Sequence, residues 1–316
     1  MSKKHLKKIV ITGALGHIGS RLIRSLSQEQ IEKVIIFDNL TTQRYASLFD
    51  LPKNLQFKFL EDDIRTADFK KLFASENIDA VIHLAALTDA ANSHERAKEV
   101  MDVNFEGLKR VANACGEAGV KLFFPSTTSV YGSQASVVDE TCAELKPQSP
   151  YAESKLAAEQ YLLEQKSNGL QFIICRFGTI FGYSVGMRFH TVVNKFLWQA
   201  VNGLPLTVWK TAWQQKRPYL DLNDCMRAVN FILERDLFDG EIYNMLTKNF
   251  AVKDIVETIK EFIPNLKIEY VDSPIMNQLS YDVNDNKFRK LGFLPQGILG
   301  KSIAETIDKL EGVKTQ

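Results

Sequence analysis

Short runs of apolar residues, many of them β-branched or aromatic, alternate with helical patterns along the first 180 residues. Alternating strands and helices indicate a parallel sheet built from βαβ units. VIIF and AVIHLA are apolar throughout, which is typical of strands covered by helices on both faces. The sequence therefore predicts an α/β fold with a doubly wound parallel sheet. The strand-like runs are KKIVIT, KVIIF, LQFKFL, AVIHLA, VKLFFPS and QFIICRF, and the helical patterns are 17–29, 66–75, 93–117 and 150–168.

The regular alternation ends after Phe181, where glycine, proline and tryptophan become more frequent. A chain of 316 residues is long enough for two domains or one large α/β unit. We expect a larger domain over 1–182 and a smaller domain over 183–316. A strand such as 242–246 could still return to the first sheet. Helical periodicity returns at 189–202, 222–235, 252–262 and 301–311.

Composition excludes several classes of partner. Lys and Arg number 39 against 38 Asp and Glu, so no excess of positive charge favours nucleic acid or an anionic membrane surface. No apolar run approaches the roughly 18 residues that span a bilayer, and MSKKHLKK leads directly into a strand, without the apolar core of a signal peptide. We expect a cytoplasmic protein. The four cysteines are far apart and form no C-x-x-C, so we expect reduced, structural thiols and no metal.

The segment TGALGHIG closes the first strand and opens the first helix. Gly13, Gly16 and Gly19 allow a tight turn and let a pyrophosphate approach backbone N–H groups where the helix dipole favours negative charge. The spacing is G-x-x-G-x-x-G, so a glycine-rich turn without a ligand is the alternative. In this strand-to-helix context the pattern predicts dinucleotide binding.

Three further strand ends fit the same ligand, because the carboxyl ends of parallel strands form the binding crevice of such sheets. Asp38 ends the second strand, where a carboxylate would bind both ribose hydroxyls and repel a 2′-phosphate. It therefore predicts NAD rather than NADP, a strand-end cap being the alternative. At the other two ends, Asp63 and Ile64 could meet adenine, and Ala85 and Ala86 would let a cofactor pass close to the backbone. We expect His83 to pack in or beside the sheet.

A tyrosine and a lysine four residues apart occupy one face of the helix that Ser149 and Pro150 introduce. A phenol titrates near about 10, and a neighbouring ammonium would lower that pKa by favouring the phenolate. Tyr151 and Lys155 therefore form a candidate acid/base pair, against the alternative of a half-exposed helical pair. The hydroxyls of STTSVYG, which follows the fifth strand, would lie beside them.

With these motifs in place, the sequence resembles the extended short-chain dehydrogenase/reductase superfamily, and most closely its NAD-dependent nucleotide-sugar epimerase/dehydratase branch, of the UDP-glucose 4-epimerase type. TGALGHIGS, FDNL, DDIR, VIHLAA, DVNFEG, STTSVYG, SPYAESK and RFGTIFG occur in that family's order over residues 8–183. The resemblance implies a Rossmann-type NAD-binding domain, which we expect over 1–182, and a smaller, mainly substrate-binding domain over 183–316. It also implies that Thr127 is the catalytic hydroxyl, Tyr151 the acid/base, and Lys155 a ligand of the nicotinamide ribose that lowers the tyrosine pKa.

The resemblance further assigns cofactor contacts. It implies that the three loop glycines hold the pyrophosphate, that Asp38 and Asn39 hold the ribose, and that Asp63 and Ile64 hold the adenine. Asn104 matches an asparagine that supports the fold near the cofactor. The remaining expected cofactor contacts are His17, Ile18, Leu40, Leu84, Ala85, Ala86 and Phe177.

Substrate contacts depart from the family pattern. Arg217 matches an arginine that contacts the nucleotide diphosphate, with a surface charge as the alternative reading. Thr179 replaces an asparagine of UDP-galactose-type epimerases, and Thr88 replaces a lysine. The nucleotide and the sugar therefore stay open. The remaining candidate substrate contacts are Thr128, Arg188, Asn194 and Tyr281.

The resemblance leaves several activities open. Dehydratases usually carry acidic residues directly after the catalytic threonine, and Thr128 and Ser129 stand there, so a 4-epimerase acting through a transient ketosugar is favoured. Nucleotide-sugar dehydration, ketosugar reduction and a non-catalytic NAD(H) sensor are the alternatives. Relatives often dimerise through the helices that correspond to 93–117 and 150–168, so we expect a homodimer.

Overall fold

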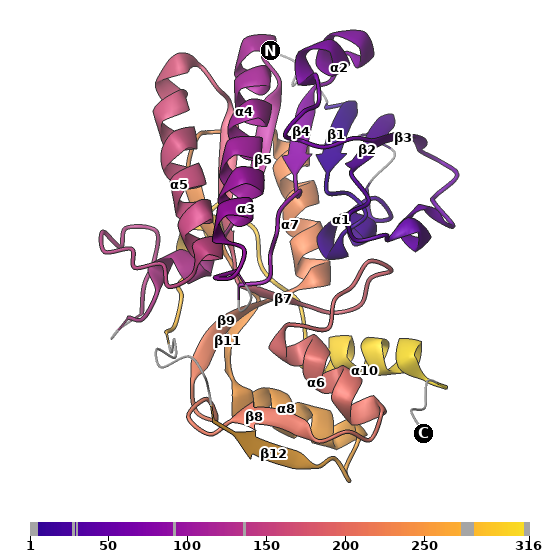
Figure 1. Cartoon of the computed structure of the whole chain (residues 1–316), viewed down its shortest axis with the longest axis vertical. Coiled ribbons are helices and arrows are strands. Elements are labelled where there is room, and N and C mark those ends of the chain that lie inside the picture. Colours follow the sequence, from indigo (N-terminus) through magenta and orange to yellow (C-terminus); the bar gives the residue numbers. More distant parts are fainter. Residues whose placement is uncertain are drawn as a thin grey trace.

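The apolar runs of the sequence form a seven-stranded parallel sheet in the computed structural model (Figure 1), which describes residues 6–26, 29, 31–90, 93–134, 137–272 and 281–312. The predicted doubly wound α/β fold is confirmed. The strand order is β10-β6-β5-β4-β1-β2-β3. The strands are β1 (Lys8–Thr12), β2 (Lys33–Asp38), β3 (Gln56–Glu61), β4 (Ala80–His83), β5 (Lys121–Thr127), β6 (Phe172–Phe177) and β10 (Ile242–Met245).

The direction of winding reverses between β1 and β4. The chain runs outward from β1 to β3 and then returns to β4, which pairs with the other side of β1. At such a switch point the loops after neighbouring strands diverge and leave a crevice at the carboxyl ends of the strands. The topology therefore places the segments after Thr12 and His83 on either side of one crevice.

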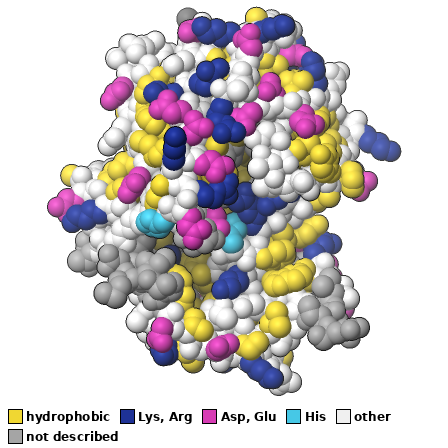
Figure 2. Space-filling model, viewed as in Figure 1, with side chains coloured by type: hydrophobic (Ala, Val, Ile, Leu, Met, Phe, Trp, Pro, Cys, Tyr) yellow, Lys and Arg dark blue, Asp and Glu magenta, His cyan; other side chains and the backbone are white. Residues whose placement is uncertain are grey.

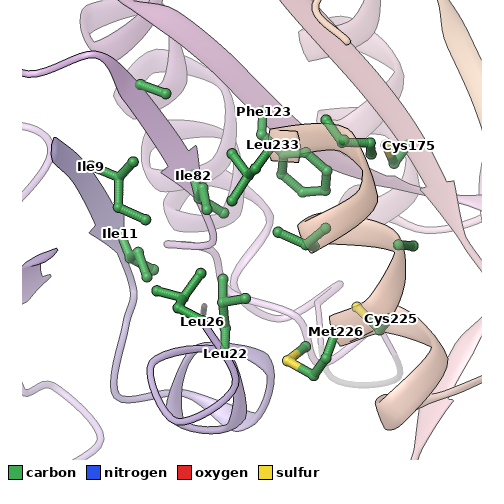
Figure 3. Close-up of a cluster of buried hydrophobic side chains, with 14 of the residues drawn as sticks. Ile9, Ile11, Leu22, Leu26, Ile82, Phe123, Cys175, Cys225, Met226 and Leu233 are labelled. Carbon is green, nitrogen blue, oxygen red and sulfur yellow. The ribbon is translucent and has the colours of Figure 1, made fainter. Parts of the chain in front are cut away.

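Successive strand residues point to opposite faces of the sheet, and each face has its own apolar core. On one face α1 (His17–Leu22) and α7 (Leu222–Arg235) pack against the sheet. Figure 3 shows Leu22 and Leu233 directed toward Ile9, Ile82 and Phe123 in this core. The other face is covered by α2 (Phe69–Glu76), α4 (Gly107–Ala118) and α5 (Pro150–Gln165).

Elements from beyond residue 182 also belong to the main sheet and the helices that cover it. β10 pairs with the edge strand β6, so the return of a late strand to the first sheet, which the sequence left open, occurs. Helix α7 spans the expected residues 222–235 and covers the face next to α1. The chain thus crosses between the main sheet and the smaller part more than once.

The smaller part lies at the carboxyl edge of the main sheet (Figure 1). It holds a three-stranded sheet, a two-stranded sheet and three helices around a separate apolar core. Its elements are β7 (Thr179–Phe181), β9 (Lys216–Asp221), β11 (Lys248–Ala251), β8 (Leu206–Trp209), β12 (Ile268–Val271), α6 (Val192–Val201), α8 (Val252–Phe262) and α10 (Leu299–Leu310). The short helix α9 (Asn286–Arg289) packs beside β10 of the main sheet instead.

Some helices differ from the expected bounds. Helix α1 ends at Leu22 instead of continuing to 29, because the N–H groups of Arg24 and Ser25 bond three residues back, to Arg21 and Leu22, and close a tighter turn. The helix expected over 93–117 starts at Ala97 as α3 (Ala97–Met101) and passes through a π-helical turn, Asp102–Glu106, into α4. Such turns are frequent at functional sites.

Within the described ranges, no helix combines the length and apolar character needed to cross a membrane. The same residues contain no group of three or more histidine, cysteine, aspartate or glutamate side chains placed to hold a metal ion. All four thiols are free, and Cys115, Cys175 and Cys225 are buried in the apolar cores.

Candidate active site

A cleft of about 560 Å³ opens at the carboxyl edge of the main sheet. Basic, acidic and histidine side chains gather across the middle of the face in Figure 2, between the part that holds the main sheet and the smaller part. The lining comes from the loops after β1, β2, β3 and β4, the end of β5, the start of α5, and segments of the smaller part. Residues that the sequence assigned separately to cofactor, catalysis and substrate therefore share one cleft.

The glycine loop is packed tightly against the end of β4. Gly13 has φ +65, and a Cβ built there would lie 2.6 Å from the backbone N and Cα of Ala85. Only glycine fits both the left-handed conformation and this approach. Behind the loop, Thr12 Oγ1 lies 2.9 Å from His83 Nδ1, and burial lowers the pKa of His83 to about 3. His83 is thus a neutral core residue, as expected.

Asp38 links the glycine loop to the end of β2. One carboxylate oxygen accepts from Leu15 N at 3.1 Å and the other from Leu40 N at 2.9 Å. The side chain also lines the cleft, and its role as a ribose ligand stays a prediction. Asp63 lies beyond it, where Arg65 and Asn39 donate to its carboxylate and hold its pKa well below the usual range. An ionised acceptor therefore stands at the expected adenine end.

The catalytic candidates meet where β5 ends and α5 begins. Ser149 caps α5, accepting from Ala152 N at 3.2 Å, and Pro150 occupies the first turn, as predicted. Burial raises the pKa of Tyr151 to about 12, while a hydrogen bond with the Thr127 side chain and the nearby Arg188 cation oppose that rise. The phenol and the threonine hydroxyl thus both face the cleft, close to each other.

Lys155 lines the cleft and is anchored to the end of β5. Its ammonium donates to the Pro125 carbonyl at 2.8 Å and lies 4.5 Å from the centre of the Phe124 ring. Burial lowers the pKa of Lys155 to about 7, with the Glu159 carboxylate acting in the opposite direction. The cation acting on Tyr151 in this structure is Arg188, and an effect of Lys155 on that phenol stays a prediction.

A buried polar network that sequence reasoning missed supports this corner. Arg176 on β6 donates to both carboxylate oxygens of Glu159, at 2.7–3.2 Å, and the Ser126 hydroxyl donates to the same carboxylate. The guanidinium stacks 4.8 Å from the centre of the Tyr131 ring. Two signals in the sequence pointed to it: Glu159 lies one turn beyond Lys155, and Arg176 interrupts an apolar strand.

A loop from the smaller part, residues 182–190, crosses the glycine loop; we call it the crossing loop. Ser184 Oγ lies 2.8 Å from His17 Nδ1, and Gly186 N donates to Ser20 Oγ at 3.0 Å. A Cβ at Gly186 would lie 2.7 Å from the Gly16 carbonyl oxygen, so the backbones touch. The crossing loop carries Arg188 into the cleft, where its Nη1 donates to Thr88 Oγ1 at 2.9 Å.

Not all expected contacts reach the cleft. Asn104 binds the Leu87 backbone and Ser154, which is the supporting role expected for it. The remaining four, which are Leu40, Thr128, Asn194 and Tyr281, are buried outside the lining. Asn194 instead fixes the crossing loop, accepting from Gly182 N and donating to Arg188 O. The expected residues that line the cleft are Gly13, Gly16, His17, Ile18, Gly19, Asp38, Asn39, Asp63, Ile64, Leu84, Ala85, Ala86, Thr88, Thr127, Tyr151, Lys155, Phe177, Thr179, Arg188 and Arg217.

Several polar lining residues carry no signal in the motifs of the sequence. Arg44 and His190 bring further basic side chains to the cleft, and Gln148 and Gln215 bring amides. They lie in connecting segments, where no periodicity indicates which way a side chain points. Only the fold reveals that these segments converge.

Comparisons with known proteins agree with this geometry. A sequence model of the NAD dependent epimerase/dehydratase family matches residues 9–245. An uncharacterized UDP-glucose epimerase of Bacillus subtilis is 31% identical over 252 residues, which cover 75% of this chain and 76% of that protein. The dTDP-D-glucose 4,6-dehydratase of Bos taurus is 31% identical over 319 residues, covering 96% and 88%.

Among solved structures, the UDP-glucuronic acid 4-epimerase of Bacillus cereus, in complex with UDP-glucuronic acid and NAD, superposes with a TM-score of 0.84. It is 25% identical, and the match covers 96% of this chain and 99% of that one. The resemblance seen in the sequence is confirmed, as is the expectation of NAD. Because the family match spans most of the chain and its motifs line one cleft, this protein belongs to the NAD dependent epimerase/dehydratase family, with NAD as its cofactor.

Proposed function

We propose that this protein is a nucleotide-sugar 4-epimerase that works through a transient ketosugar. The observation that carries the proposal is that Tyr151, Lys155 and Thr127 line one cleft, and that no acidic residue directly follows Thr127. In the next positions, the Thr128 hydroxyl donates to the Phe177 carbonyl and Ser129 N donates to Thr127 Oγ1. Neither residue has a carboxyl group to act as the second acid or base that loss of water requires.

The chain's own residues supply the proton chemistry. Tyr151, as the phenolate, takes the proton from the hydroxyl on the carbon to be inverted, and Thr127 holds the same oxygen by a hydrogen bond. When bound, NAD would supply the hydride chemistry at that carbon, as acceptor and then as donor on opposite faces of the sugar, and the glycine loop and Asp38 would hold it. Tyr151 then gives the proton back to the oxygen. The carbon loses and regains one hydride, and its oxygen loses and regains one proton, so no external oxidant is needed.

The substrate end of the cleft suits a nucleotide sugar. Arg217 on β9 lines it together with Trp209 and Tyr219, and an arginine fork matches the oxygens of a diphosphate. Thr88, Thr179 and Arg188 line the same cleft as Tyr151, and we assign them to the sugar. The known ligand of the Bacillus cereus relative, a UDP-sugar, supports the same class of substrate.

A direct assay distinguishes the candidate reactions. We would incubate the purified protein with UDP-, GDP-, CDP- and dTDP-sugars and follow the products by NMR. An epimerase inverts one carbon without loss of mass, and Tyr151→Phe should lower its turnover by roughly 10²- to 10⁴-fold. Loss of water, giving a 4-keto-6-deoxy sugar, would instead support dehydration, the second candidate, which the 31% identity to the bovine dehydratase favours.

We further propose a homodimer formed through α4 and α5. Phe105, in the π-helical turn that leads into α4, and Tyr161 of α5 meet edge to face at 6.3 Å between ring centres. Leu163 leaves 42% of its surface exposed on α5. A partner helix pair would cover this side of the molecule. Sedimentation equilibrium should give twice the chain mass, and Leu163→Glu should shift it to the monomer; a monomeric parent protein would contradict the proposal.

A further inference from the structure

Arg44 lines the cofactor end of the cleft without a partner for its buried nitrogen. It stands between β2 and the 3₁₀ turn η1 (Tyr45–Leu48), and its Nη1 makes no hydrogen bond within the part of the chain that the structure describes. A Cβ built on Gly16 would lie 3.8 Å from this Nη1, so the guanidinium lies against the glycine loop. A buried charged donor without a partner is costly, which indicates that the site is shaped for a ligand.

The backbone that carries Arg44 is fixed to the same loop. Ser47 Oγ donates to the Leu15 carbonyl at 2.9 Å, and Ser47 N donates to the Arg44 carbonyl at 3.0 Å. The Arg24 guanidinium, in the turn that follows α1, donates to the carbonyls of Ser47 and Phe49. The base of the Arg44 side chain is therefore held in place before any ligand arrives.

The charges around Arg44 favour an anion. Burial and the neighbouring Arg188 both lower the pKa of Arg44, while Asp38 raises it. Both oxygens of Asp38 already accept backbone N–H groups, so its charge is shared with the glycine loop. His17 adds no cation, because burial lowers its pKa to about 3, and its Nε2 is a second buried nitrogen without a partner among the described residues.

We infer that the Arg44 guanidinium binds a diphosphate beside the glycine loop, and that this diphosphate belongs to NAD. An arginine fork pairs well with phosphate oxygens, and a dianion would relieve the repulsion between Arg44 and Arg188. A nucleotide-sugar substrate also carries a diphosphate. We assign the substrate's diphosphate to Arg217, which lines the cleft from β9 together with Trp209 and Tyr219. The inference rests on NAD as the cofactor and does not depend on which reaction the protein catalyses.

Ligand titration separates the two diphosphates. We would strip the protein of nucleotide and measure the binding of ADP-ribose, adenosine and UDP by calorimetry for the parent protein, Arg44→Gln and Arg217→Gln. Arg44→Gln should weaken ADP-ribose by roughly 10- to 100-fold, the loss of one hydrogen-bonded charge, while adenosine and UDP keep their affinities. Arg217→Gln should weaken UDP and leave ADP-ribose unchanged. Arg110→Gln, on the exposed side of α4, is the matched control and should change neither.

Each other result overturns the assignment. Unchanged ADP-ribose affinity in Arg44→Gln would show that the guanidinium does not touch the ligand. An equal loss for adenosine and ADP-ribose would show a structural role, and a loss for UDP instead would place the substrate's diphosphate at Arg44. Arg44→Lys, which keeps the positive charge but not the forked geometry of a guanidinium, should recover part of the ADP-ribose affinity. A melting temperature of each variant equal to that of the parent protein shows that the loss of affinity is not caused by misfolding.

Discussion

At the scale of single residues, the reactivity of this cleft depends on how the surroundings of Tyr151 shift its acidity. Burial raises the pKa of the phenol, and only the Thr127 hydrogen bond and the Arg188 cation act against it. The Arg188 guanidinium donates to the Thr88 hydroxyl, and the backbone carbonyl of Arg188 accepts a hydrogen bond from the Asn194 side chain. The structure thus places the positive charge of Arg188 near the phenol that we propose as the acid/base, in addition to the lysine of the sequence motif.

Replacing Arg188 by Gln should raise the pKa of Tyr151, because removal of a cation destabilises the phenolate. For a partly buried charge at this range we expect a rise of about 0.5–1 pH unit. The ultraviolet difference spectrum of tyrosinate, with Tyr151→Phe subtracted, measures it without any substrate. Arg188→Lys keeps the charge and serves as the control. An unchanged midpoint in Arg188→Gln would mean that Arg188 acts on the substrate alone.

The sequence was a good guide to residues at strand ends and a poor one to residues in loops. Thr127, Tyr151 and the glycines could be placed because the carboxyl ends of parallel strands meet at one edge. The positions of Arg44 and Arg188 in the cleft could not be predicted, because both residues lie in loops without periodicity. The contact of Arg188 with Thr88 could not be predicted either, because it joins two loops that are far apart in the chain. Tyr281 and Thr128 were expected at the substrate and instead contact each other in the interior.

At the scale of elements, one face of α5 connects chemistry to the sheet. Tyr151, Lys155 and Glu159 follow at intervals of four residues, and Glu159 binds Arg176 of β6 through a buried bidentate pair. This pair locks the helix that carries the acid/base residue onto the strand beside it. A buried pair of this kind contributes little net stability, but removing one partner leaves a buried charge uncompensated.

Glu159→Gln should therefore lower the free energy of unfolding by about 3–5 kcal/mol. Arg176→Met in addition should recover part of that loss, because the uncompensated charge is gone. Urea denaturation of the single and double variants measures both values. Glu164→Gln, at an exposed position of the same helix, is the control and should stay within about 0.5 kcal/mol of the parent. Additive effects of the two substitutions would contradict this account.

The crossing loop is the second element-scale device, and Gly186 is its contact point. Gly186→Ala should push the loop off the glycine loop, since its Cβ would overlap the carbonyls of Leu15 and Gly16. We expect a lower melting temperature and faster loss of bound NAD on gel filtration. Gly116→Ala in α4, where a Cβ would have its nearest neighbour at 4.0 Å, should instead stabilise by about 0.5–1 kcal/mol. Equal behaviour of the two variants would rule out a tight contact at Gly186.

Element bounds and element placement were not equally predictable. Helix α7 has the expected bounds because Asp221 caps its start, accepting from Asn223 N, and Asp236 ends it in the left-handed conformation. Its apolar stripe indicated that one face is buried, but nothing in the stripe tells which sheet it covers. The packing of α7 beside α1 on the main sheet follows only from the path of the whole chain.

At the scale of the whole molecule, the carboxyl edge of the sheet holds both the cleft and two histidines whose pKa values are lowered by burial. His17 and His83 are held neutral there, with pKa values lowered to about 3 from 6.5, chiefly by burial. Folding therefore excludes a proton that the unfolded chain binds below pH 6.5. Because the unfolded state binds more protons in this window, stability falls as the pH drops from 6.5 toward about 3.

His83 gives the cleaner test, because it is fully buried and only 1% exposed. Near pH 5 its exclusion of the proton should cost about 2 kcal/mol relative to pH 7.5. His83→Asn keeps a polar partner for Thr12 and removes the titration, so its unfolding free energy should fall less between these pH values than that of the parent protein. Urea denaturation at both pH values measures the difference, and His94→Asn, at an exposed position, should keep the parental slope. If His83→Asn loses as much stability on acidification as the parent does, the proton is not excluded at this site and the acid sensitivity of the fold must come from its carboxylates.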